Sequence, residues 1–240
     1  MPRIPFVAGN WKMQKTVAET VAYIKEFRLL VKDLSDIDIV LAPPFTSIHA
    51  AAEAARNSTV AISAQDVYWE KQGAFTGEVS AAELAEAGVR YVEVGHAERR
   101  RLFGETDEVV AAKTATALRH GLVPVLCVGE TVEGPDAAEV AIAQLGSALA
   151  GAPAGRVIVA YEPVWAIGAD APASDDHIRR VCAALRDARR EPHDAVIYGG
   201  SAGPGLLTRL GDAVDGIFLG RFAHDPVALR AVIDEAVARG

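Results

Sequence analysis

FVAGNWK, at residues 6–12, is an apolar run followed at once by a turn that carries an amide and a cation. A doubly wound α/β sheet is the main rival architecture, and it has a Gly-x-Gly-x-x-Gly turn after its first strand. The turn of this chain, Gly9 to Lys12, lacks those glycines. A closed parallel barrel needs no such turn, and it gathers the residues that follow its strands on one face. The stretch therefore favours the barrel.

Seven more apolar runs follow, and helix-like stretches separate them. Most runs are continuously apolar rather than alternating, which is typical of parallel strands covered by helices. Residues 17–31 and 109–118 are two of the intervening stretches, with apolar residues recurring at helical spacing. The predicted strands are residues 6–8, 37–42, 60–64, 91–94, 123–128, 157–161, 196–198 and 217–219. Because no linker divides the chain, we predict one α/β domain over residues 1–240, a single (β/α)8 barrel.

The composition and charge limit the kinds of partner that this protein is expected to bind. Half of the 240 residues are hydrophobic, which is ample for a large core, and the net charge is −8 without any basic stripe. A nucleic-acid partner is therefore not expected, and an anion must be bound locally, by helix N-termini and a few placed cations. Cys127 and Cys182 are interpreted as buried free thiols of a cytoplasmic protein. We see no signal peptide and no membrane-spanning run, so we expect a soluble protein.

Polar residues follow the predicted strands, where a barrel has its active site. Glu162 lies at the end of the sixth strand among apolar neighbours and is placed to move protons, although a lone glutamate there more often caps or pairs. His96 precedes a predicted helix, whose N-terminus discourages protonation, so it would act as a neutral hydrogen-bond donor. Asn10 and Lys12 follow the first strand. Lys12 would attract an anionic substrate; a Schiff-base lysine, as in aldolases, is the alternative, but those lysines usually lie in a later strand.

Glycines after the last two strands indicate the ligand class. Gly199-Gly200-Ser201 follows the seventh strand and Gly220 the eighth. In barrels, these two loops form the usual phosphate site, and glycine lets backbone N–H groups approach the oxygens. With the acid–base residues, they indicate proton transfer next to a carbonyl in a phosphorylated metabolite. A non-catalytic barrel that only binds a sugar phosphate is the remote alternative, and it predicts the loss of an acid–base group.

Residues 65–78 form a connection too long for a simple turn, and loops of this length are usually functional. The aromatic residues Tyr68 and Trp69 precede a glycine-flanked tip with Phe75, Thr76 and Gly77. Exposed aromatic side chains on such a tip indicate a partner surface, most simply a second copy of the chain in a homodimer. The alternative is that these side chains fold back onto their own barrel.

Four separated motifs carry a family resemblance: GNWKM at residues 9–13, VGHAERR at 94–100, YEPVWAIG at 161–168 and YGGS at 198–201. In this order they resemble the signatures of the triosephosphate isomerase family, from about Phe6 to the C-terminus. The resemblance implies a TIM barrel and an aldose–ketose isomerase of glycolysis and gluconeogenesis. Such an enzyme interconverts dihydroxyacetone phosphate and glyceraldehyde 3-phosphate through an enediolate, and needs no metal or cofactor.

The resemblance also implies roles for single residues. Glu162 abstracts the proton, His96 polarises the carbonyl, and Asn10 and Lys12 stabilise the developing oxyanion. Gly168, Ser201 and Gly220 offer N–H groups to the phosphate. Glu98 supports Lys12, and we also expect Glu98 and Arg99 to form a supporting ion pair. The lid extends from Pro163 to about residue 173 and begins with Pro163, Val164, Trp165, Ala166 and Ile167. Thr76 would insert into the partner subunit.

The chain departs from the family pattern around the lid and the phosphate. Ala97 replaces the usual serine, Phe218 a usual leucine, and ADAPAS at residues 169–174 the usual lid hinge. Arg221 stands where the family has a second glycine; a cation at a helix N-terminus opposes the dipole, so it is expected to serve an anion or packing. These departures resemble a branch that isomerises erythrulose phosphate in tetritol catabolism. Because the motifs that carry Asn10, Lys12, His96 and Glu162 are intact, the triose reaction is the prediction, and a tetrulose phosphate substrate is the alternative.

Overall fold

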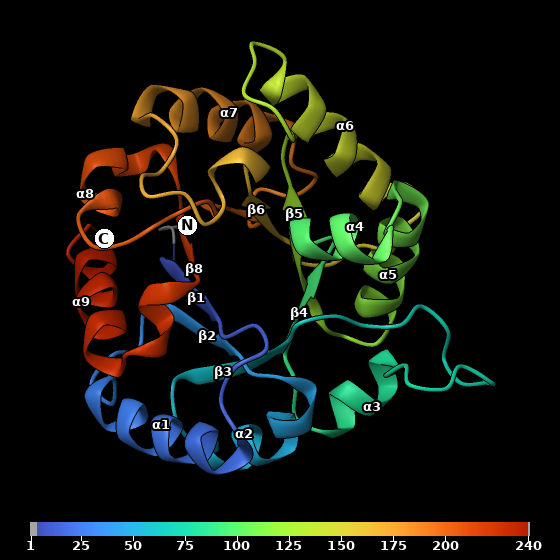
Figure 1. The fold of residues 1–240 in the computed structure, drawn as a ribbon, viewed down its shortest axis with the longest axis vertical. Coiled ribbons are helices and arrows are strands. Elements are labelled where there is room, and N and C mark those ends of the chain that lie inside the picture. The colour runs from blue at the N-terminus through green and yellow to red at the C-terminus, as the bar shows by residue number, and fades with distance from the viewer. Residues whose placement is uncertain (1–3, 240) are drawn as a thin grey trace.

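The computed structural model describes residues 4–239, and its eight parallel strands close into a barrel in chain order, with β1 paired to β8. Helices cover the outside of the barrel (Figure 1). The strands are β1 Phe6–Asn10, β2 Asp38–Ala42, β3 Val60–Ala64, β4 Tyr91–Val94, β5 Val123–Val128, β6 Ile158–Tyr161, β7 Ala195–Tyr198 and β8 Gly216–Leu219. All eight predicted strands are confirmed, with ends shifted by at most two residues. The closed order also rejects the doubly wound sheet.

The helices lie between the strands, as the alternating pattern predicts. Their bounds are α1 Val17–Leu30, α2 Ile48–Ala55, α3 Ala81–Glu86, α4 Ala97–Phe103, α5 Asp107–Arg119, α6 Ala137–Leu149, α7 Asp175–Ala188, α8 Leu206–Leu210 and α9 Pro226–Val237. Short 3-10 turns lie at Phe45–Ser47, Val164–Ala166, Gly211–Ala213 and Arg221–His224. The stretches predicted at residues 17–31 and 109–118 correspond to α1 and α5. Thr16 begins α1 with a capping box, in which its side chain and that of Glu19 satisfy each other's backbone N–H groups.

Two layers of apolar side chains hold this arrangement. One fills the barrel interior, and the other lies between the strands and the surrounding helices. Closure needs a close backbone approach between β1 and β8, because a β-carbon at Gly216 would lie 1.8 Å from the carbonyl oxygen of Phe6. Only glycine fits there. Closure brings the loop after β8 next to the loop after β1.

The connection at residues 65–78 projects from the barrel between β3 and α3 (Figure 1). Tyr68 lies against Trp69 and Phe75, with ring centroids 4.1 Å and 4.7 Å apart. Phe75 nevertheless stays 39% exposed. The aromatic residues thus stabilise the loop itself and leave part of its tip in solvent. Separately, no helix among residues 4–239 has the length and apolar character needed to cross a membrane.

Candidate active site

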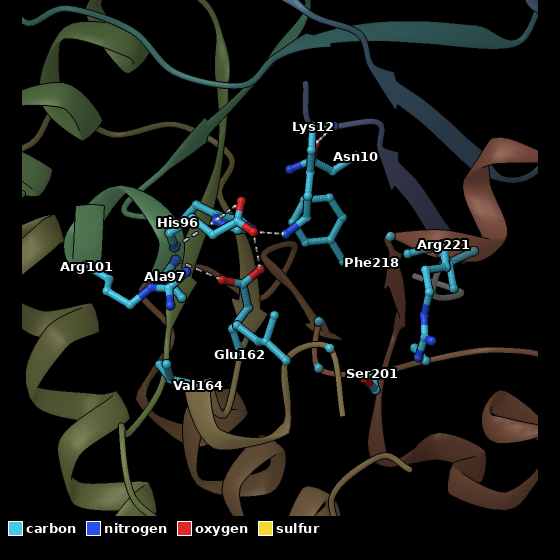
Figure 2. Close-up of a pocket in the computed structure, with 18 of the residues that line it drawn as sticks. Asn10, Lys12, His96, Ala97, Arg101, Glu162, Val164, Ser201, Phe218 and Arg221 are labelled. Atoms are coloured by element: carbon cyan, nitrogen blue, oxygen red, sulfur yellow. Dashed lines mark hydrogen bonds and ion pairs between the residues drawn. The ribbon is translucent and has the colours of Figure 1, made fainter. Parts of the chain in front are cut away.

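A cavity of about 430 Å³ opens at the carboxyl ends of the strands. The loops after β1, β4, β6, β7 and β8 each contribute side chains to it (Figure 2). The predicted residues that line it are Asn10, Lys12, His96, Glu98, Glu162, Val164, Ile167, Gly168, Ser201, Gly220 and Arg221. Arg99 and the other lid residues Pro163, Trp165 and Ala166 lie outside this lining, as do Phe75, Thr76 and Gly77. The cavity therefore joins the predicted proton-transfer and phosphate residues.

Glu162 and His96 face each other at the centre of the cavity. Glu162 directly follows β6 and is only 2% exposed. Its Oε1 lies 3.6 Å from His96 Nε2, and its Oε2 accepts a long hydrogen bond from the Ala97 N–H at 3.4 Å. Gly129 supports the backbone here, because a β-carbon at that position would lie 2.1 Å from the Glu162 carbonyl oxygen. The carboxylate of Glu162 thus directs one oxygen toward the imidazole of His96 and the other toward the backbone N–H of Ala97.

The hydrogen bonds of His96 indicate its tautomer. Nδ1 accepts from the backbone N–H of Glu98 at 3.1 Å, at the beginning of α4. A ring nitrogen that accepts a hydrogen bond carries no proton, so the proton of the neutral imidazole lies on Nε2. Phe218 holds the ring edge-on, with centroids 6.5 Å apart. His96 therefore presents an N–H donor to the cavity.

Lys12 has an unusual backbone conformation, with φ at 51°, a region that side-chain-bearing residues adopt rarely. Two contacts hold it: its N–H donates to Asn10 Oδ1 at 2.6 Å, and its carbonyl accepts from Gln65 Nε2 at 2.9 Å. Its ammonium group lies 2.5 Å from Glu98 Oε1. Partial burial acts to raise the pKa of Glu98, but the hydrogen bond and charge of Lys12 outweigh it, and the pKa falls below its ordinary value. Glu98 thus remains a carboxylate that orients the lysine.

The predicted ion pair between Glu98 and Arg99 is wrong, because each of them pairs with another residue. Because successive helix residues point in different directions, Arg99 lies behind α4 rather than beside Glu98. It pairs with Asp66 at 2.9 Å and Glu105 at 2.5 Å, and both carboxylates also bind the buried Lys113. This network ties the loops after β3 and α4 together. Arg99 is a structural support, whereas Glu98 pairs with Lys12.

Glu93 is a buried acid that the sequence analysis missed. It lies in β4, is 1% exposed, and its Oε2 accepts from Asn10 Nδ2 at 2.7 Å. Its Oε1 has no hydrogen-bond partner among the described residues. Burial first, and then the charge of Glu162, raise the pKa of Glu93 well above its ordinary value. The signal in the sequence was a single charged residue inside an otherwise apolar strand.

A second missed acid, Glu130, holds the lid. Its Oε1 accepts from Trp165 Nε1 at 2.7 Å and from the hydroxyl of Tyr161 at 3.0 Å, and it lies 3.2 Å from His177 Nε2. These contacts fix the first part of the lid, the 3-10 turn Val164–Ala166. One glycine separates Glu130 from the end of β5, and this position after a strand is its only signal in the sequence.

The second part of the lid is tied to the phosphate end of the cavity. The carbonyl oxygen of Ala169 accepts from Ser201 Oγ at 2.8 Å and from Arg221 at 3.2 Å. The backbone N–H of Ser201 donates to the carbonyl of Ala166 at 3.1 Å. In this conformation, Ser201 and Arg221 therefore hold the lid. The N–H group assigned to the phosphate by the resemblance is engaged with the lid as well.

Comparison with known proteins gives consistent matches over most of the chain. A family model described as triosephosphate isomerase matches residues 5–236. An L-erythrulose-1-phosphate isomerase from Pectobacterium atrosepticum is 52% identical over 82% of this chain and 80% of its own length. Triosephosphate isomerases from Solibacter usitatus and Trichlorobacter lovleyi are 42% and 44% identical, covering 97% and 91% of this chain and 99% and 93% of their own.

The buried carboxyl of Glu93 makes a prediction about stability. Because its pKa is raised above the ordinary value of 4.5, its contribution to stability is full below that value and is lost as the pH rises toward the folded-state pKa. Glu93→Gln keeps an acceptor for Asn10 and removes the ionisation. We expect the melting temperature of the variant, relative to the parent, to rise steadily between about pH 5 and pH 8 in calorimetry.

Glu86→Gln is the matched control, because Glu86 is exposed on α3. Its difference from the parent should stay constant over the same pH range. A constant difference for Glu93→Gln as well would show that Glu93 ionises alike in the folded and unfolded chains.

Proposed function

Because the chain belongs to the triosephosphate isomerase family, we propose that it moves a carbonyl group between neighbouring carbons of a four-carbon ketose phosphate, L-erythrulose 1-phosphate. The observation that carries the reaction is the geometry of Glu162 and His96, a buried carboxylate 3.6 Å from an imidazole N–H donor. The choice of substrate is supported by the 52% identity to the erythrulose-phosphate relative, against 42% and 44% for two triosephosphate isomerases.

Proton transfer by Glu162 begins the reaction. The carboxylate takes a proton from the hydroxyl-bearing carbon next to the carbonyl, and the electron pair of that C–H bond forms the enediolate double bond. The same carboxyl group then returns a proton to the former carbonyl carbon. L-erythrulose 1-phosphate becomes erythrulose 4-phosphate in this way, with no atom gained or lost. A triose substrate, treated likewise, yields an aldehyde.

The enediolate oxygens need donors while they carry negative charge. His96 Nε2–H is available for this purpose, and its neutral tautomer can exchange a proton between the two oxygens. Lys12 supplies a positive charge that Glu98 holds in place. Asn10 Nδ2 donates one hydrogen to Glu93 and has a second for the substrate. We assign the catalytic roles to these residues.

We assign phosphate binding to the end of the cavity that is lined by Gly168, Ser201, Gly220 and Arg221. Arg221 is the one cation of this group, and it already contacts the lid through Ala169. A phosphate there would complete a bridge between lid and barrel. Closure of the lid over the bound substrate would exclude water from the enediolate.

The triose reaction is the second candidate. It is favoured by the intact acid–base residues and by the triosephosphate isomerases that match more than nine tenths of the chain. In that case the enzyme would serve glycolysis and gluconeogenesis, whereas the four-carbon reaction would serve tetritol catabolism. We place the protein in the cytoplasm in either case, since both cysteines are buried and free.

We further propose a homodimer. Besides Phe75, four large apolar side chains are exposed: Met13 after β1, Phe45 after β2, and Leu102 and Phe103 at the end of α4. Exposed apolar side chains, together with a projecting loop, are typical of a subunit interface. Gln65, at the base of this loop, also donates to the Lys12 carbonyl. The interface would thereby support the conformation of Lys12.

The substrate proposal predicts the outcome of a direct comparison. We expect kcat/KM for L-erythrulose 1-phosphate to exceed that for dihydroxyacetone phosphate, measured on the same preparation. A value near the diffusion limit, on the order of 10⁸ M⁻¹s⁻¹, for the triose would instead identify the glycolytic enzyme.

The role of Glu162 predicts a large effect of shortening its side chain. Glu162→Asp withdraws the carboxylate from the carbon that loses its proton, so kcat should fall by about 100-fold or more on either substrate. The melting temperature should change little. Glu191→Asp serves as a control for the substitution itself, because Glu191 lies before β7, on the opposite face of the barrel. An unimpaired kcat in Glu162→Asp would refute the role.

The interface proposal predicts that removal of Phe75, Thr76 and Gly77 yields monomers in sedimentation velocity. The barrel itself should remain folded, because the tip lies outside its core. A variant that still sediments as a dimer would contradict the assignment of this loop to the interface.

A further inference from the structure

The cavity has two ends, with the proton-transfer pair between them. Ser201 and Arg221 lie on one side of Glu162 and His96, and Ala97, Arg101 and Val164 lie on the other (Figure 2). The first end is the one assigned to phosphate. At the second end, the side chains of Ala97 and Arg101 have no part in the proton transfer by Glu162, and Arg101 is a cation.

Arg101 differs from the two arginines that precede it in α4. Arg99 is held by Asp66 and Glu105, and Arg100 donates to Asp107 at 2.7 Å and to the carbonyl of Gly95 at 3.0 Å. Among residues 4–239, no hydrogen bond or ion pair is found for Arg101. Its side chain runs toward Ala97 and the cavity (Figure 2). Its guanidinium donors are thus available to a ligand.

Two apolar residues line the cavity at the same end as Arg101. Ala97 is the first residue of α4, and its methyl group offers no hydrogen-bonding atom to the cavity. Val164, on the lid, provides another apolar side chain at this end. A hydroxyl group placed here would find its side-chain donor in Arg101.

The chemistry of the proposed substrate supplies such a group. L-erythrulose 1-phosphate differs from dihydroxyacetone phosphate by one hydroxymethyl group, attached to the carbon from which the proton is removed. With the phosphate at the Arg221 end and that carbon beside Glu162, the hydroxymethyl group points away from the phosphate. It then extends toward Ala97 and Arg101.

We propose that Ala97, Arg101 and Val164 form the subsite for the terminal hydroxymethyl group, and that Arg101 donates a hydrogen bond to its hydroxyl. This inference rests on the proposed four-carbon substrate and names the residues that select it. Arg101 is a specificity residue, because a triose has no atom that reaches it. Sites that hydrogen-bond a substrate hydroxyl discriminate strongly against the analogue that lacks it.

The test is the ratio of kcat/KM for L-erythrulose 1-phosphate to kcat/KM for dihydroxyacetone phosphate. Arg101→Leu removes the hydrogen-bond donors of the guanidinium group and substitutes a residue of similar helix propensity. We expect the ratio to fall by about 10-fold or more. Ala97→Ser should also lower it, because the added hydroxyl occupies part of the subsite. Arg119→Leu is the matched control: Arg119 is exposed at the end of α5, on the opposite face of the barrel, and the ratio should not change.

Two failures can be told apart. If the parent enzyme does not turn over L-erythrulose 1-phosphate, the proposed function fails, and the subsite with it. If the parent turns it over and Arg101→Leu keeps the parent ratio, the subsite is wrong and the proposed function stands. Arg221→Ala gives an internal comparison, since a loss at the phosphate end should affect both substrates alike and leave the ratio unchanged.

Discussion

Pairing of β1 with β8 is the constraint on which the site depends. Phe6 lies opposite Gly216, and the absence of a side chain at Gly216 lets the two backbones meet. Without this closure, the loop that carries Lys12 and the loop that carries Arg221 would lie on opposite edges of an open sheet. Closure of the barrel brings both loops to the same cavity, which Glu162 also lines. A backbone contact deep in the barrel thus determines the geometry of the chemistry above it.

The site also shows how an acidic protein can bind an anion. The chain has a net charge of −8, and three glutamates, Glu93, Glu98 and Glu162, lie in or beneath the cavity. The environments of these glutamates shift their pKa values in different directions. Burial beside Glu162 favours the protonated form of Glu93, and Lys12 keeps Glu98 ionised. Only part of the acidic charge therefore opposes a phosphate, while Arg101 and Arg221 contribute positive charge at the two ends.

Strand positions and the main site residues could be predicted from sequence because each has a local signal. Buried parallel strands are continuous apolar runs, and barrels gather chemistry at the residues that follow them. Side-chain direction has no such signal. The Glu98–Arg99 pair was wrong because neighbours in a helix diverge, and Glu93 was missed because its inward direction depends on the register of β4. The lid contacts of Ser201 and Arg221 likewise depend on residues about 30 and 50 positions away in the chain.

Substrate choice within this architecture must be made at the ends of the cavity. The carbon that loses its proton has the same relation to the carbonyl in triose and tetrulose phosphates, so Glu162 and His96 see equivalent bonds in both. The phosphate is also common to both. What differs is the group on the far side of the reacting carbon, and the subsite we propose for it has the methyl group of Ala97 and the guanidinium of Arg101, for which residues 4–239 offer no hydrogen bond or ion pair. A family can therefore change its substrate through one wall of the cavity while its acid–base residues stay intact.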